Sequence, residues 1–539
     1  MDYNYLADLL YPNIKTLPAD IEAKYPKRDL PEGAKVTRFA PSPTGFVHFG
    51  GLFPTRVSER LAHQSGGVFY LRIEDTDNKR EVKGAVENLL ETYKYYKIEF
   101  DEGPEGDYGP YRQTERVEIY QTFTKELIRL GKAYPCFCTS DELKEIRERQ
   151  KELKLNFGYY GEWAKWRGAD IETIKQKLNE KIPFVLRFKS DGNANNKIKF
   201  NDLIKGDIEL TENEFDHVLL KSNGVPTYHL AHVVDDHLMW TTHVVRGEQW
   251  LPSLAFHIQL FNAFGYKMPK YLHNAELLKN DPNSNSRKKL SKRDNAASLA
   301  FYQKTGYAVD SIVEYIMTLL NSNYEEWRTA NPDKPYTDFP FSVKKMSPSG
   351  CLFDFDKLND VSKNTISRMT AEEVYTQTLE WAEIYDVEFA DKLKQDREYA
   401  LKILSIGRGG NKPRKDLTVW SDVKPYISLF YDDYFKIEAE IPNSDDFKTT
   451  LEKFIQTFDI NDSSEVWFNK IKNVAAEIGY ASEMKEYKKA PENYRGHVGD
   501  VSMFIRIAVT GKINSPDMYD VMQILGENRV VNRIKEILK

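Results

Sequence analysis

The first hundred residues alternate between strand-like and helix-like patterns of hydrophobic positions. Residues 35–40 read as a strand that stops at the proline-rich turn of residues 41–45, and residues 52–64 have helical periodicity. A second strand follows Gly66 and Gly67. The next helix carries its apolar residues on one face, at Val86, Leu89, Leu90 and Tyr93. This order of elements predicts a parallel α/β sheet.

A block of different character, residues 114–214, interrupts this pattern. It combines helices, a strand at residues 136–138 and an Asn- and Lys-rich stretch near residues 191–199. Strand patterns then resume, and a helix is expected from about residue 251 to residue 264. The resumed strands are predicted at residues 217–220, 227–231 and 243–246. We therefore expect an α/β sheet that is interrupted by an inserted domain.

The last third of the chain is predicted to be helical. A polar loop at residues 280–286 ends in a basic run, residues 287–293, and a proline-rich linker covers residues 331–340. Beyond this linker, runs such as residues 464–478 and 521–539 lack the alternation that is typical of strands.

Length and composition narrow the class of protein. At 539 residues the chain is too long for one compact domain. Its 41% hydrophobic and 29% charged residues are typical of soluble globular proteins, and no apolar run approaches the ~20 residues of a membrane helix. The acidic N-terminus differs from a signal or transit peptide, and three cysteines make no disulfide framework. We expect a cytoplasmic protein without a membrane segment.

The turn between the first strand and the first helix has the composition of a phosphate-binding site. Residues 41–51 combine several glycines with His48. Backbone N–H groups in a glycine-rich turn and the dipole of the following helix both favour an anion, and His48 is placed to donate to a phosphate oxygen. Taken alone, such a segment is more often a proline-stiffened turn that carries a surface histidine.

Two further segments carry charges suited to a substrate. The lysines of residues 289–293 suit the charge on a transferred phosphoryl group, although short basic runs are usually solvated surface. Acidic residues crowd the end of the second strand within residues 69–77. Ligands of open α/β sheets bind at that edge, where a carboxylate can take an ammonium group. Thr76 and Asp77 also fit a helix cap.

Together, the His-x-Gly-Gly turn and the Lys-Leu-Ser-Lys-Arg segment resemble the two signatures of class I aminoacyl-tRNA synthetases. The surrounding residues narrow the resemblance to glutamyl-tRNA synthetases of the bacterial type. Four segments carry it in the family's order and spacing: residues 37–45, 72–77, 109–115 and 228–237. The resemblance is strong over residues 35–310 and weaker over the C-terminal third, where motifs are few.

The resemblance implies an α/β fold, with a class I Rossmann-type catalytic domain, an inserted acceptor-binding domain and a mostly α-helical C-terminal anticodon-binding region. The implied segments are an N-terminal extension (1–34), the two halves of the Rossmann domain (35–115 and 215–279), the inserted tRNA acceptor-binding domain (116–214), the Lys-Leu-Ser-Lys-Arg loop with the stem-contact region (280–362), and two helical anticodon-binding domains (363–435 and 436–539).

The same resemblance implies an enzyme, a glutamate–tRNA ligase. Such an enzyme uses ATP with Mg²⁺ to attach L-glutamate to the 3′ end of tRNA(Glu). Glutamyl-adenylate is the intermediate, and AMP and pyrophosphate are released. The sequence leaves open whether tRNA(Gln) is also charged. We expect the protein to act as a monomer.

Two other functions share parts of this pattern: a glutaminyl-tRNA synthetase and a non-catalytic tRNA-binding paralogue. The first typically lacks an arginine at position 246 and ends in β-barrels, whereas residues 363–539 read as helical. Intact His48, Glu74, Arg246 and Lys292 argue against a non-catalytic paralogue. A small-molecule cytidylyltransferase would need neither this length nor the second basic motif.

The resemblance assigns residues to two sites. For ATP they are His48, Gly50, Gly51, Gln249, Lys289, Ser291 and Lys292, of which His48, Gly50, Lys289 and Lys292 form the catalytic set. For glutamate they are Arg38, Ala40, Ser42, Glu74, Tyr228, His232 and Arg246. Glu74 is assigned to the substrate ammonium. Arg246 is assigned to the side-chain carboxylate, because a guanidinium pairs bidentately with a carboxylate and a neutral amide leaves its charge unpaired.

Several positions depart from the family pattern. His232 stands where asparagine is expected, and Gln249 replaces an acidic residue that is often found near ATP. Cys136 and Cys138 match half of a zinc site, but residues 160–165 supply neither cysteine nor histidine. Two thiolates do not close a tetrahedral site, so we predict no zinc and assign no metal-ligating residue.

The C-terminal region is expected to read the anticodon. The net charge of −6 argues against a general polyanion binder, but a local basic patch suffices for nucleic acid. Residues 408–415 are the densest basic segment there, with Trp420 and Tyr426 nearby to stack on bases. Arg414 resembles an arginine that helps to read the third anticodon base in this family. A surface turn is the alternative interpretation of the segment.

Overall fold

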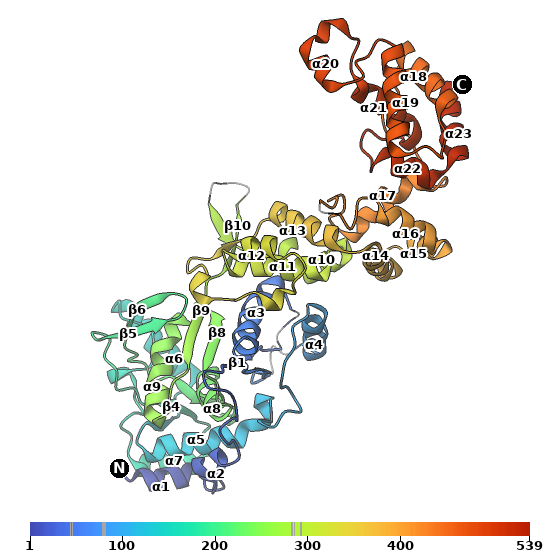
Figure 1. Cartoon of the computed structure of the whole chain (residues 1–539). Coiled ribbons are helices and arrows are strands. Elements are labelled where there is room, and N and C mark those ends of the chain that lie inside the picture. The colour runs from blue at the N-terminus through green and yellow to red at the C-terminus, as the bar shows by residue number, and fades with distance from the viewer. Residues whose placement is uncertain are drawn as a thin grey trace. The chain divides into compact units, whose positions relative to one another are not determined.

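The computed structural model describes the whole chain except residues 44, 46, 78–81, 282–283, 285, 291–293 and 411, and describes only the backbone at Asn295. The described chain divides into two compact units (Figure 1). The first unit contains residues 1–299 and 316–354, and the second contains residues 300–315 and 355–539. The helices are α1 (Tyr3–Leu10), α2 (Pro18–Glu22), α3 (Phe49–His63), α4 (Ala85–Tyr95), α5 (Val117–Arg129), α6 (Ser140–Glu152), α7 (Ile171–Asn179), α8 (Tyr228–Leu238), α9 (Leu254–Phe264), α10 (Leu299–Thr305), α11 (Val309–Leu320) and α12 (Tyr324–Ala330), followed by those of the second unit described below.

Two parallel strand pairs form the sheet of the first unit. Strand β1 (Val36–Phe39) pairs with β2 (Val68–Leu71), and β8 (His243–Gly247) pairs with β9 (Lys270–Asn274). The amide of Thr242 donates to the carbonyl oxygen of Val36 at 2.9 Å, which joins the two pairs. Helix α3 follows β1 and packs against β1, β2 and β8. This arrangement confirms the predicted α/β fold, including a second half of the sheet that returns after the inserted block.

The inserted block carries sheets of its own. Strands β3 (Ala133–Cys136) and β4 (Val185–Phe188) form an antiparallel sheet with β7 (Val218–Leu220), which lies beyond the block. The strand expected at residues 217–220 thus forms, but it joins this antiparallel sheet and not the parallel one. Strands β5 (Lys197–Asp202) and β6 (Gly206–Thr211) form a hairpin. Further along the chain, β10 (Leu277–Asn280) lies between β11 (Arg287–Lys289) and β12 (Cys351–Leu352). The strand expected at residues 136–138 therefore ends at Cys136, where it was expected to begin.

The prediction of a strand at residues 227–231 is wrong, because helix α8 begins in this segment. Buried residues occur all around this helix, so its sequence shows neither a clear polar face nor a clear period. A short apolar run of this kind does not distinguish a buried strand from a buried helix. The difference matters because the first turn of α8 presents Tyr228 to the cavity described below.

The N-terminal extension folds onto the first unit. Leu6, Leu10 and Ile21 share a hydrophobic core with residues of α5 and α8. The buried ammonium of Lys125 donates to the carbonyl oxygens of Tyr11 at 2.9 Å and of Ile14, at 2.8 Å. The extension thus contributes both apolar area and hydrogen-bond acceptors to the first unit.

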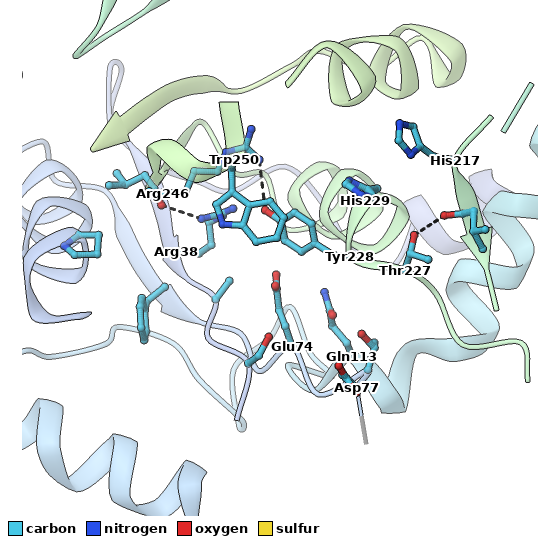
Figure 2. A pocket seen from close by; sticks show the side chains of 18 of the residues that line it. Arg38, Glu74, Asp77, Gln113, His217, Thr227, Tyr228, His229, Arg246 and Trp250 are labelled. Carbon is cyan, nitrogen blue, oxygen red and sulfur yellow. Dashed lines mark hydrogen bonds between the residues drawn. The ribbon is translucent and has the colours of Figure 1, made fainter. Parts of the chain in front are cut away.

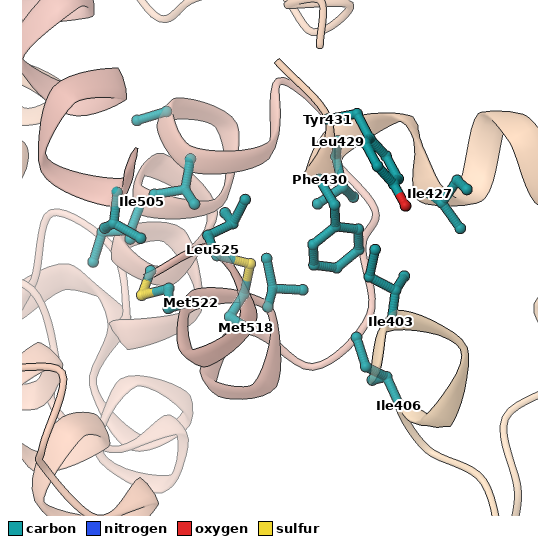
Figure 3. Packing of buried hydrophobic residues seen from close by; sticks show 14 of the residues in the cluster. Ile403, Ile406, Ile427, Leu429, Phe430, Tyr431, Ile505, Met518, Met522 and Leu525 are labelled. Carbon is teal, nitrogen blue, oxygen red and sulfur yellow. The ribbon is translucent and has the colours of Figure 1, made fainter. Parts of the chain in front are cut away.

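The second unit is helical and has one extended hydrophobic core. Besides most of α10 and the first part of α11, it contains the helices α13 (Phe355–Arg368), α14 (Ala371–Tyr385), α15 (Val387–Gln395), α16 (Arg397–Ser405), α17 (Val423–Ile427), α18 (Asp445–Thr457), α19 (Ser464–Glu477), α20 (Met484–Lys489), α21 (Val498–Thr510), α22 (Met518–Leu525) and α23 (Glu527–Leu538). In Figure 3, Phe430 and Leu429 approach Met518 and Leu525 of α22, and all four belong to this core. The helical C-terminal region is therefore confirmed. Among the described residues, no helix is both long and apolar enough to span a membrane.

Candidate active site

A cavity of about 810 Å³ lies beside the carboxyl ends of β1, β2 and β8. Open α/β sheets bind ligands at this edge, and the volume is typical of small-molecule sites. Six residues assigned to glutamate line the cavity, which we call the larger cavity: Arg38, Ala40, Ser42, Glu74, Tyr228 and Arg246. Several of them are drawn in Figure 2. The sheet edge thus brings together side chains from both halves of the interrupted α/β pattern.

Arg246, at the end of β8, is buried and its neighbours are aromatic or neutral. Its Nη1 donates to the Tyr228 hydroxyl at 3.4 Å (Figure 2). Its Nε donates to His273 Nε2 at 2.9 Å, and its Nη1 also donates to His257 Nδ1 at 3.1 Å. The guanidinium lies 4.7 Å from the centroid of the Tyr271 ring. Its Nη2 is buried and has no acceptor among the described residues. An unpaired charged donor of this kind is costly unless a ligand carboxylate completes it.

Glu74 follows β2 and points toward the group formed by Tyr228 and Trp250 (Figure 2). Its carboxylate accepts a hydrogen bond from Arg72 at 3.0 Å. Burial raises the pKa of Glu74, and the nearby guanidiniums of Arg72 and Arg38 oppose this shift only in part. A buried carboxylate with raised pKa gains from a second cation, which fits the expected ammonium of an amino acid.

Behind the cavity wall, Asp236 of α8 holds two of the site's arginines. It accepts from Arg72 Nη1 at 2.7 Å and from Arg38 Nε at 3.3 Å. Burial alone would raise the pKa of Asp236, but Arg38 and Arg72 hold it well below the usual range. Asp236 therefore remains ionised and fixes the orientation of Arg38 at the cavity.

His232 is the residue assigned to glutamate that does not line the larger cavity. Its ring stacks behind Tyr228, with ring centroids 5.6 Å apart and an angle of 5° between the planes. Its Nδ1 lies 2.8 Å from Asp236, and its Nε2 bonds the Tyr271 hydroxyl at 2.8 Å. Both ring nitrogens thus face protein groups, and the glutamate contact of His232 stays a prediction.

A second, smaller cavity of about 180 Å³ adjoins the first. Four residues assigned to ATP line it: His48, Gly50, Gln249 and Lys289. Gly51 is not among its lining residues, and Ser291 and Lys292 lie outside the described residues. Pro54 and Gly247 line both cavities, so a ligand in one can reach a ligand in the other. The two signature motifs therefore converge on one small cavity, although the chain separates them widely.

Asn274, at the end of β9, is a lining residue of the smaller cavity that the sequence did not single out. Its side-chain amide is buried, and neither its nitrogen nor its oxygen has a hydrogen-bond partner among the described residues. Buried amides normally bond, so this one favours a ligand with both a donor and an acceptor. Its position at the carboxyl end of a parallel strand was the only signal that the sequence offered.

Lys289 is exposed and forms an ion pair with Glu276, another lining residue of the smaller cavity. His48 is the N-cap residue of α3, and its carbonyl accepts from the Gly51 amide at 2.7 Å. Helix α3 thus opens beside the smaller cavity, in the geometry that favours a phosphate.

The anticodon candidate Arg414 lies in the second unit, with its side chain 42% exposed. Its guanidinium donates to both carboxylate oxygens of Asp416, at 2.7 and 3.0 Å. Trp420 is buried in the hydrophobic core, so it offers no ring face to an anticodon base, contrary to the expectation. The role of Arg414 stays a prediction.

The cysteine pair of the inserted block lies beside an aromatic residue. Cys138 Sγ and the Tyr159 hydroxyl are 3.5 Å apart. Within the part of the chain that the structure describes, no group of three or more His, Cys, Asp or Glu residues has the arrangement of a metal site. The prediction that the protein binds no zinc stays a prediction.

Three histidines of the first unit should make the stability of the fold sensitive to acid. Burial lowers the pKa of His217, His229 and His243 to about 4, against 6.5 for a free histidine. As the pH falls, the histidines of the unfolded chain are protonated first, because their pKa is higher than in the folded protein. The free energy of unfolding should therefore fall between pH 6.5 and pH 4, by on the order of 1.4 kcal/mol per pH unit for each histidine.

Urea unfolding at pH 7, 6 and 5 measures this loss. His243 does not line the larger cavity, so the variant His243→Gln keeps the cavity while removing one titrating group. It should lose less stability on acidification than the wild type. Equal losses for the two proteins would contradict the assignment of the loss to buried neutral histidines.

Comparison with known proteins identifies the class and then the family. A model of the family described as "tRNA synthetases class I (E and Q), catalytic domain" matches residues 35–359, and one described as "Anticodon binding domain" matches residues 388–538. The parallel sheet with its adjoining cavities and these matches define a class I tRNA synthetase. Over 100% of both chains, the sequence is 49% identical to a glutamate–tRNA ligase of Acetivibrio thermocellus and 45% identical to one of Clostridium perfringens strain SM101. The chain belongs to the glutamate–tRNA ligase family.

A solved structure agrees with this family. The crystal structure of a glutamate tRNA ligase from Elizabethkingia meningosepticum, in complex with its amino acid, is 28% identical in sequence and matches with a TM-score of 0.75. The match covers 94% of this chain and 99% of that chain.

Proposed function

We propose that this protein attaches L-glutamate to the 3′ end of tRNA(Glu) in two steps, with ATP as the energy source and glutamyl-adenylate as the intermediate. The observation that carries the proposal is the buried Arg246, whose Nη2 has no acceptor in the described part of the chain and whose cavity adjoins the one lined by His48 and Lys289. The names of the relatives from Acetivibrio thermocellus and Clostridium perfringens support it.

In the first step, an oxygen of the α-carboxylate of glutamate attacks the α-phosphorus of ATP, and pyrophosphate leaves. Arg246 binds the side-chain carboxylate and Glu74 binds the ammonium, which directs the α-carboxylate toward the smaller cavity. The protein's contribution is to orient the two substrates and to stabilise the phosphate charge. His48, Gly50 in the first turn of α3 and Lys289 all line that cavity, where they can stabilise this charge.

In the second step, a ribose hydroxyl at the 3′ end of the tRNA attacks the acyl carbon of the adenylate, and AMP leaves. Mg²⁺ bound with ATP would supply positive charge against the triphosphate, and a carboxylate of the protein would help to hold it. Glu276 is the acidic residue among the described lining residues of the smaller cavity and fits this requirement.

The remaining assignments rest on the family resemblance. Residues 116–214 contact the tRNA acceptor end, residues 363–435 and 436–539 read the anticodon, and Arg414 contributes to that reading. Three free cysteines are compatible with the reducing cytoplasm in which we place the protein. A monomeric state stays a prediction.

Aminoacylation of purified tRNA(Glu) and tRNA(Gln) with labelled glutamate or glutamine tests the proposed function. Glutamate should be attached to tRNA(Glu), and the same assay decides whether tRNA(Gln) is a second substrate. Attachment of glutamine, or of neither amino acid, would overturn the proposal.

The variant Gly50→Ala tests the ATP site. A methyl group at position 50 would lie 3.1 Å from both Cε1 and Nδ1 of the His48 ring, so the imidazole must shift. We expect the KM for ATP to rise about tenfold, because a displaced hydrogen bond to a charged group is worth about 1.5–3 kcal/mol. ATP–pyrophosphate exchange in the presence of tRNA measures the change.

Gly103→Ala is the matched control, because its added methyl group meets nothing within 4 Å. Its KM for ATP should equal that of the wild type. If Gly50→Ala also leaves this KM unchanged, His48 has no role in holding ATP.

A further inference from the structure

The protein groups that hold Arg246 are all uncharged. Its guanidinium donates to His273 Nε2, His257 Nδ1 and the Tyr228 hydroxyl. We infer that His273 and His257 are positioning residues that fix Arg246 without neutralising its charge, and that they thereby set the preference for glutamate over glutamine. The inference rests on the proposed function and concerns residues that the sequence motifs did not single out.

The first arm of this arrangement runs from Arg246 through His273 to Asp202. A guanidinium only donates hydrogen bonds, so His273 Nε2 must accept and the ring proton of the neutral imidazole must lie on Nδ1. Asp202 is the last residue of β5. The Nδ1–H of His273 donates to a carboxylate oxygen of Asp202 at 2.7 Å. Asp202 thus locks the one tautomer of His273 that offers a lone pair to Arg246.

The second arm runs from Arg246 through His257 to His229. His257 Nδ1 accepts from Arg246, so its proton lies on Nε2 and is donated to His229 Nδ1, 2.9 Å away. The same reasoning places the proton of His229 on its Nε2. His229 therefore does for His257 what Asp202 does for His273: it accepts the distal N–H and fixes the tautomer.

Both bridging histidines are neutral at physiological pH. Burial lowers the pKa of His257 well below its ordinary value, and the neighbouring His232 and Arg246 add to this effect. Burial also lowers the pKa of His273, and the opposing influence of Asp202 is smaller. A proton on either ring would face the guanidinium as a second cation, which the buried site disfavours.

The contrast with the other buried arginines shows what this arrangement preserves. Three that lie near the same cavity each touch a carboxylate: Arg38 pairs with Asp236, Arg72 with Asp236 and Glu74, and Arg116 with Asp235. Among the described residues, no carboxylate forms an ion pair with Arg246. The first arm ends in the carboxylate of Asp202, but the imidazole ring of His273 separates this carboxylate from the guanidinium of Arg246. The charge of Arg246 is therefore held in position and left for the substrate.

A carboxylate introduced next to Arg246 by mutation should form an ion pair with it and so neutralise the charge that otherwise binds the substrate. The variant His257→Asp puts an anion at the position of Nδ1, whereas His257→Asn puts a neutral acceptor there. We expect His257→Asp to lower the ratio of kcat/KM for glutamate to kcat/KM for glutamine at least about thirtyfold, mainly through the KM for glutamate, because the substrate must displace an internal ion pair. His257→Asn should restore most of the ratio. ATP–pyrophosphate exchange with tRNA present measures all four constants.

The first arm, through His273, supplies the same comparison independently. His273→Gln keeps an acceptor at the position of Nε2, whereas His273→Leu removes it. The glutamate-to-glutamine ratio should fall more for His273→Leu than for His273→Gln, which decides the question if His257→Asp does not fold. His243→Gln, away from the cavity, should leave the ratio unchanged.

The outcomes separate the inference from the proposed function. If the wild type does not attach glutamate to tRNA, the proposed function fails. If the wild type attaches glutamate and the ratio is the same in His257→Asp, His257→Asn and wild type, only the inference fails. A general loss of activity toward both amino acids at an unchanged ratio, with a lowered melting temperature, would show that the histidines are merely structural and would also overturn it.

Discussion

Replacing Arg246 by alanine should lower kcat/KM for glutamate by at least about a hundredfold, since removing one partner of a buried charged pair costs about 3–5 kcal/mol. In the free protein, Arg246 already makes hydrogen bonds to His273, His257 and Tyr228, but its Nη2 has none. The side-chain carboxylate of glutamate would complete this set. Glutamine, whose amide carries no charge, would gain much less from the same guanidinium.

The variant Arg246→Lys refines this expectation. It keeps a positive charge but loses the planar fork that donates to three acceptors at once. We expect its kcat/KM for glutamate to lie between those of the wild type and Arg246→Ala. Because the loss concerns the amino acid alone, the KM for ATP should change much less than the KM for glutamate in both variants.

Arg129→Ala is a suitable control for these variants. Arg129 belongs to the same unit and pairs with Asp8 of the N-terminal extension, but it does not line either cavity. Its glutamate kinetics should match the wild type. If Arg246→Ala retains wild-type kinetics while Arg38→Ala loses glutamate activation, the side-chain carboxylate is bound by Arg38 and the assignment of Arg246 is wrong.

The sequence predicted the site's charged residues better than their surroundings. His48, Gly50 and Lys289 were assigned from two motifs far apart in the chain, and the structure gathers them at one cavity. The first motif follows β1 of the parallel sheet, at the edge where such sheets bind ligands. Lys289 instead lies in the antiparallel hairpin of β10 and β11, so its assignment rested on the family resemblance and not on the topology of the sheet.

The partners of Arg246 were not predictable in this way. His257 lies on α9, His273 on β9 and Asp202 on the hairpin of the inserted block. Helix α9 and strand β9 follow β8 along the chain, and β9 pairs with β8 so that His273 stands opposite Arg246. A pattern of hydrophobic positions gives neither this strand register nor the side of α9 that faces Arg246, and a single buried histidine in a sequence is usually a core residue. Only the packed structure shows that two of them converge on one guanidinium.

Local patterns failed where burial was nearly complete. Residues 227–231, where α8 begins, were predicted as a strand because buried residues surround this helix and leave no polar face. The N-terminal extension was recognised only as a segment outside the catalytic domain, yet Leu6 and Leu10 anchor it in the core of the first unit. In both cases tertiary contacts, which the sequence pattern does not display, decide the structure.

A charge network behind the larger cavity combines three buried arginines with three buried carboxylates. Its members are Arg38, Arg72, Arg116, Glu74, Asp235 and Asp236. Asp236 accepts from Arg72 at 2.7 Å and from Arg38 at 3.3 Å, and Asp235 accepts from Arg116 at 2.8 Å. Removing one member would leave its partners as unpaired charges that are excluded from water.

Replacing Asp236 by asparagine should therefore destabilise the first unit by about 3–5 kcal/mol and lower its melting temperature by about 5 °C. Asparagine keeps the shape but leaves Arg38 and Arg72 with one anion too few. The loss should be complete at pH 7, because a carboxylate with lowered pKa stabilises the fold above its unfolded pKa and loses that contribution only as the pH falls toward the folded value.

The exposed ion pair between Asp191 and Lys132 in the same unit provides the control. Asp191→Asn should change the free energy of unfolding by less than about 1 kcal/mol, since the solvent screens both charges. Differential scanning calorimetry of the wild type and the two variants makes the comparison. If Asp236→Asn and Asp191→Asn melt at the same temperature, the arginines are not held by Asp236 and must be stabilised by their backbone and aromatic contacts instead.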